Sequence, residues 1–136
     1  MAARVLPSGS VRTDGGEYMT INECYACMGA DYGDVLRRMG KAERVAKFLA
    51  MFPDEPSYGL LCSALAQGNA QEAFRAAHSL KGVCMNLGLS SLGDAASKMT
   101  EALRGGLLPA DVGALLDEVD GRYRETVSCI RAFMQG

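Results

Sequence analysis

Residues 69–88 read NAQEAFRAAHSLKGVCMNLG, and their apolar spacing predicts one long amphipathic helix. Asn69 followed by Glu72 is a typical start signal, because a side-chain oxygen at the first position accepts a hydrogen bond from a free backbone N–H. Gly88 is a typical helix end. Five residues recur at spacings of three and four and predict a buried seam: Ala73, Ala77, Leu80, Cys84 and Leu87.

A second stripe lies beside that seam and carries the only histidine of the chain. It comprises His78, Lys81, Gly82 and Met85, and we expect it to face solvent or a groove. Glycine costs a helix about 1 kcal/mol relative to alanine, but here it removes bulk beside the imidazole. Lys81 can bring an ammonium to the same ring. A neutral imidazole is a nucleophile, so this grouping suits transient capture of an anionic electrophile such as a phosphoryl group.

The rest of the chain also predicts helices, separated by glycine and proline. Thr20 and Glu23 form a capping box before a short helix that ends near Met28. Further helices are predicted over residues 31–39, 42–52, 58–67, 90–104 and 109–134. Ser90 or Ser91 is expected to cap the fourth of these, and Pro109 to occupy the first turn of the last. No alternating apolar and polar run predicts a strand.

Short connections favour antiparallel neighbours. The fold class predicted is therefore all-α, an antiparallel four-helix bundle with extra short N-terminal helices. Its walls would be residues 42–67, 69–87, 90–104 and 109–134. Residues 19–136 should form the domain, and residues 1–18 a weakly structured extension. A vector remnant, or a true start at Met19, are alternative interpretations of that extension.

Composition limits the function classes. The 136 residues are 49% hydrophobic and 22% charged, which suits one globular domain. A net charge of −2 argues against nucleic-acid binding. No apolar run approaches the ~18 residues of a membrane span, and no secretory signal is visible. We therefore expect a cytoplasmic protein that binds neither nucleic acid nor membrane.

The run AHSLKG at residues 77–82, followed by NLG at residues 86–88, resembles the signature of histidine-containing phosphotransfer (HPt) domains. The resemblance extends over the bundle from about Met19 to Gln135. It implies that His78 accepts a phosphoryl group, on Nε2, from an aspartyl phosphate of a receiver domain and passes it to another receiver. Lys81 would stabilise the phosphoryl charge, and Gly82 would leave room for the acidic pocket of the receiver.

The resemblance also implies partners and further site residues. The partners would be receiver domains of response regulators or hybrid histidine kinases, docking over His78 and an apolar patch near Met85. Family members often place a polar side chain near the phosphate on the adjacent antiparallel helix. Folding the chain back near residue 89 makes Thr100 the first candidate and Lys98 the second.

No nucleotide-binding loop of the GxxxxGK[ST] kind is present in the sequence. The protein is therefore expected to be a phosphotransfer intermediate and not an enzyme with its own ATP site or kinase activity. We expect no cofactor and no metal in this chain, although the receiver partner would need Mg²⁺.

The five cysteines are odd in number and irregular in spacing, so reduced thiols that behave as small hydrophobes are expected. Cys24 and Cys27 form a CxxC motif, but redox use normally needs a βαβ context and zinc needs two more ligands. Two alternative functions stay open. One is an interaction-only helical bundle that binds signalling partners without phosphotransfer, and the other is a thiol-based sensor using Cys24 and Cys27.

Overall fold

The structure, a computed structural model, describes residues 10–12 and 18–135. The predicted all-α bundle is confirmed. Two strands precede the helices: β1 (Ser10–Arg12) and β2 (Tyr18–Thr20). The helical elements are α1 (Ile21–Cys27), α2 (Tyr32–Met39), α3 (Ala42–Met51), the 3-10 turn η2 (Phe52–Asp54), α4 (Ser57–Ala66), α5 (Ala70–Leu87), α6 (Ser90–Leu103) and α7 (Val112–Met134). Most of the predicted N-terminal extension, residues 1–9 and 13–17, lies outside the described residues.

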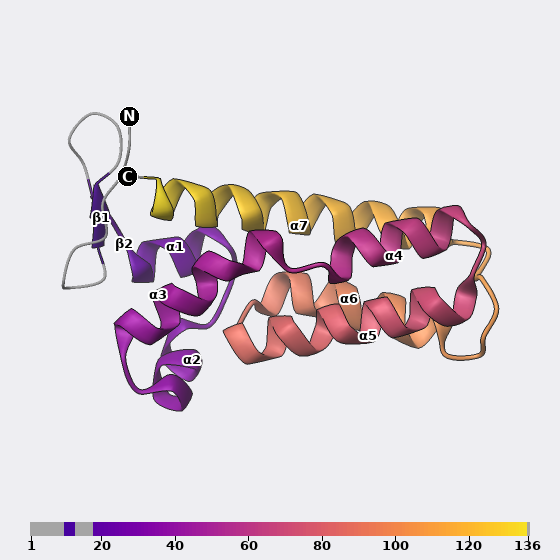
Figure 1. The fold of residues 1–136 in the computed structure, drawn as a ribbon, viewed down its shortest axis with the longest axis horizontal. Helices are drawn as coiled ribbons and strands as arrows, with labels where there is room; N and C mark the ends of the chain where they lie inside the picture. Colours follow the sequence, from indigo (N-terminus) through magenta and orange to yellow (C-terminus); the bar gives the residue numbers. More distant parts are fainter. Residues whose placement is uncertain (1–9, 13–17, 136) are drawn as a thin grey trace.

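Four walls form the bundle, as predicted. Helix α4 packs against α5, α5 against α6, and α6 against α7. Helix α3 precedes α4 and extends the same wall of the bundle (Figure 1). The core between them holds fully buried side chains from every wall: Leu49, Leu61, Leu80, Leu92, Met99, Ile130 and Phe133. Tyr58 of α4 also reaches α7, where its ring stacks on Tyr123 and its hydroxyl donates to Asp120.

The predicted start signals of α1 and α5 are confirmed. The backbone N–H of Glu23 donates to the Thr20 hydroxyl at 3.0 Å, and the N–H of Thr20 donates to the Glu23 carboxylate at 2.7 Å. Asn69 Oδ1 accepts from the N–H of Glu72 at 3.1 Å. Each bond satisfies a backbone donor that the first helical turn leaves free.

Two predicted helix starts are wrong. Leu89, and not Ser90 or Ser91, occupies the cap position of α6, and it makes no side-chain capping bond. The reason is the tight turn at Gly88, which buries Leu89 in the core so that Ser90 is already helical. Pro109 precedes α7 by three residues, and its carbonyl accepts from the N–H of Val112 at 3.2 Å. The fixed φ of proline suits such a turn as well as a first helical turn.

The prediction that no strand forms is also wrong. β1 and β2 pair antiparallel, with Ser10 opposite Thr20, Val11 opposite Met19 and Arg12 opposite Tyr18. Strands of three residues are too short to show an alternating pattern in the sequence. β2 runs directly into α1, so the hairpin lies beside the same end of α7 that α1 covers (Figure 1).

Helices α1 and α2 form what we call the N-terminal cap, residues 21–39, at one end of the bundle (Figure 1). α1 packs against α7 through buried side chains, among them Cys24 and Tyr25. The Tyr25 hydroxyl donates to the carbonyl of Leu87 at 2.8 Å, and the N–H of Asp31 donates to the carbonyl of Gly88 at 2.8 Å. The cap is therefore fastened to α7 and also to the carboxyl end of α5.

The expectation of reduced cysteines throughout is wrong for one pair. Cys27 of α1 and Cys129 of α7 form a disulfide, with their Cα atoms 6.0 Å apart. They are 102 residues apart in sequence, and only the packing of α1 on α7 brings them together. Cys24, Cys62 and Cys84 are free thiols. Within the described part of the chain, no helix has the length and apolar character needed to cross a membrane.

Candidate functional site

The two stripes predicted on α5 are confirmed. All five residues of the predicted seam are buried, which fixes the rotation of the helix against the core. His78 consequently lies on the outer face and is exposed. Lys81 is half-buried one turn further on, and Met85 is 63% exposed. A Cβ added at Gly82 would meet nothing within 4 Å, so the space beside His78 on this face is open.

An aromatic ring adjoins the histidine and a cation adjoins that ring, and neither residue is predicted from the sequence. Phe74 lies one turn before His78, and the two rings stack with their centroids 6.0 Å apart and their planes 24° apart. The guanidinium of Arg104, from the end of α6, lies 5.3 Å from the centroid of the Phe74 ring. A cation at this distance is attracted by the ring. The Phe74 ring therefore has both the imidazole and the guanidinium as neighbours.

Arg104 is held by a carboxylate on its own helix. Its Nε and Nη2 donate to Glu101 Oε2 at 2.8 and 2.6 Å. This hydrogen bond lowers the pKa of Glu101 below its usual value, and the positive charges of Arg104 and Lys81 act in the same direction. Glu101 is thus the counter-ion of Arg104, and the charge of Lys81 on the neighbouring helix acts on the same carboxylate.

The predicted phosphate neighbours on α6 lie elsewhere. The prediction for Thr100 is wrong, because its side chain is fully buried and its hydroxyl donates to the carbonyl of Ala96 at 2.7 Å. Lys98 is exposed, but its ammonium lies 3.3 Å from Glu118 of α7. That pairing holds the Lys98 charge at α7 and not at α5.

A different stripe of α6 borders the candidate site. A hollow of about 390 Å³ is lined by Lys81 and Met85 of α5 together with Asp94 and Ser97 of α6. Asp94, Ser97 and Glu101 recur at spacings of three and four, so they share one face of the helix. This spacing can be read from the sequence. Ser97 precedes Lys98 by one residue, and Glu101 follows Thr100 by one residue.

A larger apolar hollow lies on the other side of the carboxyl half of α5. Its volume is about 760 Å³, and Val83 and Asn86 of α5 form part of its wall. Phe48 and Met51 of α3 also line it and are among the exposed large apolar side chains of the protein. Exposed apolar surface beside a candidate site is typical of a contact region for another protein.

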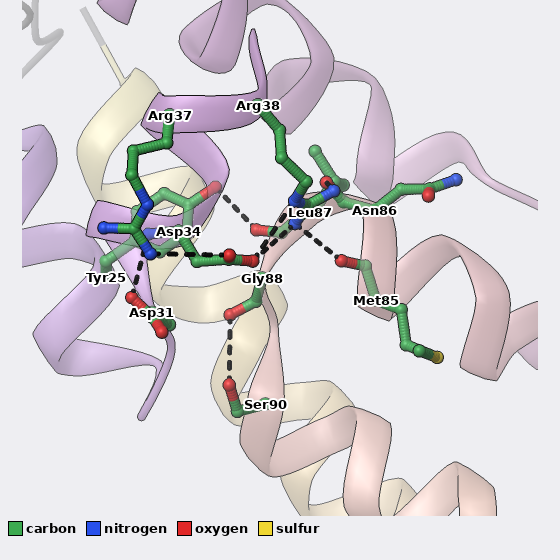
Figure 2. A network of polar contacts seen from close by, with 10 residues as sticks. All are labelled: Tyr25, Asp31, Asp34, Arg37, Arg38, Met85, Asn86, Leu87, Gly88 and Ser90. Atoms are coloured by element: carbon green, nitrogen blue, oxygen red, sulfur yellow. Dashed lines mark hydrogen bonds and ion pairs between the residues drawn. The ribbon is translucent and has the colours of Figure 1, made fainter.

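Helix α2 contributes residues to the lining of both hollows. Arg38 ties this helix to the end of α5 (Figure 2). The guanidinium donates to the carbonyl of Met85 at 2.9 Å and to that of Asn86 at 3.1 Å. Asp34 pairs with the same guanidinium at 3.0 Å. Arg38 thereby satisfies carbonyls that the last turn of α5 leaves free.

The arrangement offers nucleophilic chemistry at one exposed imidazole. Lys81 and Arg104 can offset negative charge there, and the open space at Gly82 admits a reacting group from outside. Among the described residues, no three histidine, cysteine, aspartate or glutamate side chains lie close enough together to hold a metal ion.

Comparison with protein families gives one match. The family model described as the Hpt domain matches residues 45–132, more than half of the chain, and this range includes α4 to α6 and most of α3 and α7. The N-terminal cap precedes the matched range. No curated protein and no solved structure matches the chain.

Proposed function

The chain belongs to the Hpt domain family, whose members act in phosphorelays, and on that premise we propose that His78 is its phosphoacceptor. His78 takes a phosphoryl group from the aspartyl phosphate of one receiver domain and gives it to the aspartate of another. The protein supplies no ATP site or kinase activity of its own, and any Mg²⁺ required belongs to the receiver. The protein works as a separate cytoplasmic carrier between signalling proteins.

The observation that carries this proposal is the exposure of His78 beside the empty space at Gly82. Transfer requires an imidazole nitrogen to approach the phosphorus in line with the aspartyl oxygen that leaves. A histidine recessed in a cleft could not meet an aspartate that itself lies in a pocket of the partner. The convex surface of α5 and the missing side chain at position 82 both favour that approach.

Lys81 and Arg104 stabilise the charge that arrives with the phosphoryl group. Glu101 pairs with Arg104 before transfer, and the phosphoryl oxygens then compete with its carboxylate for that cation. Phe74 limits the rotation of the imidazole by stacking on it. The site therefore holds its nucleophile and its cations in place before a partner arrives.

The partners are receiver domains of response regulators or hybrid histidine kinases. Met85 provides exposed apolar surface two turns along α5 from His78. An interface of this kind, with an apolar centre and charged surroundings, suits a short-lived complex.

The test is phosphoryl transfer from a panel of radiolabelled receiver domains to the wild-type protein and to His78→Gln. Label that is acid-labile and base-stable, and that appears on wild type alone, is the expected result. Receivers that bind the folded wild-type protein without labelling it would contradict the proposal. That outcome would favour the interaction-only bundle.

A further inference from the structure

Besides the peptide chain that leads from α2 into α3, one covalent bond among the described residues joins the N-terminal cap to the bundle. The disulfide between Cys27 and Cys129 joins α1 to α7, and the cap itself precedes the part of the chain that matches the Hpt family. Its other attachments are noncovalent contacts, chiefly the packing of α1 on α7 and hydrogen bonds to the end of α5. The position of the cap therefore depends in part on one bond that a redox reaction can make or break.

The three nearby cysteines differ in exposure, because Cys27 is exposed whereas Cys24 and Cys129 are buried. Cys27 is exposed, so a thiol or a peroxide can reach its sulfur. Cys24 lies one turn earlier with its thiol directed at the carbonyl of Cys129, at 3.6 Å, and is completely buried. Burial raises the pKa of the Cys24 thiol to about 12. Because the thiolate is the reactive form, Cys24 is the less reactive of the two thiols of α1.

The cap touches the carboxyl end of α5, about two turns beyond His78. Arg38 of α2 binds the carbonyls of Met85 and Asn86, in the last turns of the helix that carries His78 (Figure 2). Asp31 and Asp34 line the hollow that contains Lys81, and Arg38 and Met39 line the larger apolar hollow. A shift of α2 would therefore alter both hollows beside the exposed face of α5.

We propose that Cys27 and Cys129 are a reversible thiol–disulfide modification site that latches the N-terminal cap and so adjusts partner docking beside His78. In the oxidising direction, the Cys27 thiol reduces a peroxide to water and becomes a sulfenic acid. The Cys129 thiol then displaces a second water from that sulfur and forms the S–S bond. In the reducing direction, a small dithiol transfers two electrons and two protons to the bond and becomes a disulfide itself.

The docking part of this proposal rests on the proposed function, whereas the latch does not. The first experiment is amide hydrogen exchange on the full chain, oxidised by hydrogen peroxide and reduced by dithiothreitol. Reduction is expected to speed exchange in residues 21–39 by about tenfold or more and to leave the centre of α6 unchanged. Equal exchange in the two forms would overturn the latch, whether or not His78 accepts phosphate.

Two serine variants separate the latch from a general effect of thiols. Cys27→Ser, which leaves Cys129 without its partner, should exchange like the reduced wild type after treatment with either hydrogen peroxide or dithiothreitol. Cys62→Ser, which removes a half-buried free thiol of α4, should respond to oxidation like wild type. A Cys62→Ser protein that no longer responds would overturn the assignment to Cys27 and Cys129.

The docking part is read from the Met85 methyl resonance and from receiver affinity. Reduction should shift that resonance and weaken binding of a receiver that labels His78 by about threefold or more. Reduction could speed exchange in the cap and yet leave both the Met85 resonance and the receiver affinity unchanged. The disulfide would then affect only the stability of the cap, and its proposed role in docking would be overturned. The Met85 resonance shows whether reduction changes the surface of α5 even if no receiver transfers a phosphoryl group.

Discussion

Phe74 and His78 stack against each other one turn apart on α5, with ring centroids 6.0 Å apart. Replacing Phe74 by leucine keeps apolar bulk but removes the flat ring. We expect transfer from a receiver to His78 to slow by about three- to tenfold, because the imidazole then samples more rotamers. Stability should fall by less than about 1.5 kcal/mol, since Phe74 is only partly buried.

The measurement is the single-turnover rate of phosphoryl transfer at saturating receiver. Tyr123→Leu is the matched control, because Tyr123 is a partly buried aromatic residue of α7 whose ring stacks on Tyr58. A Phe74→Leu protein that transfers at the wild-type rate would show that the stack does not position the imidazole.

A larger side chain at position 82 should raise the stability of the fold and lower the rate of phosphoryl transfer to His78. Glutamine at this position meets open space and favours a helix more than glycine does, so Gly82→Gln should stabilise the fold by about 0.5 kcal/mol. The same side chain obstructs the approach to His78, and transfer should fall by about tenfold or more.

Gly121→Gln provides the control for that substitution. Gly121 lies within α7, and a Cβ there also meets nothing within 4 Å. It should gain similar stability, measured by urea unfolding, without loss of transfer. Equal transfer by the two variants would contradict the role of Gly82 as an open approach.

Substitution of Thr100 should leave the rate of phosphoryl transfer unchanged, because its hydroxyl is buried and donates a hydrogen bond to the Ala96 carbonyl. Thr100→Val keeps the shape of the side chain and removes one hydrogen bond. We expect transfer within about twofold of wild type and a stability change within about 1.5 kcal/mol. A large loss of transfer with little loss of stability would mean that Thr100 does reach the phosphoryl group.

Gly88 should tolerate no side chain, because it joins α5 to α6 in a left-handed conformation at φ +69°. A Cβ there would lie 2.7 Å from the backbone oxygen of Asp31. Gly68 has nearly the same φ, +70°, but open space around it. Gly68→Ala should cost about 1 kcal/mol of unfolding free energy, and Gly88→Ala about 1 to 3 kcal/mol more.

Urea unfolding of the two alanine variants gives the comparison directly. Their difference isolates the contact between the cap and the turn from the conformational cost that both positions share. Equal destabilisation would contradict the close packing of Asp31 on Gly88.

Much of the bundle could be predicted because its signals are local. The spacing of Ala73, Ala77 and Leu80 sets the rotation of α5, and that rotation alone exposes His78. The predicted antiparallel register of α5 against α6 is also nearly the one in the structure. A Cβ at Gly93 would lie 3.3 Å from that of Cys84, and counting along both helices from there places His78 opposite residues 99 and 100.

Two features were harder to predict: the direction in which each α6 side chain faces, and the contacts between residues far apart in the sequence. A correct antiparallel register does not say which α6 side chain turns outward, and one residue of difference puts Thr100 in the core and Glu101 at the surface. The pairing of Cys27 with Cys129 depends on where α1 lies against α7, and no local pattern contains that information. The same holds for Arg38, whose carbonyl partners are more than forty residues away.

The most direct test of the account is the site of phosphorylation itself. The wild-type protein is incubated with a phosphorylated receiver, and its modified residue is located by fragmentation mass spectrometry under neutral or basic conditions. We expect one phosphoryl group, on His78, which disappears when an unphosphorylated second receiver is added. A phosphoryl group on another residue, or one on His78 that no receiver removes, would contradict the account.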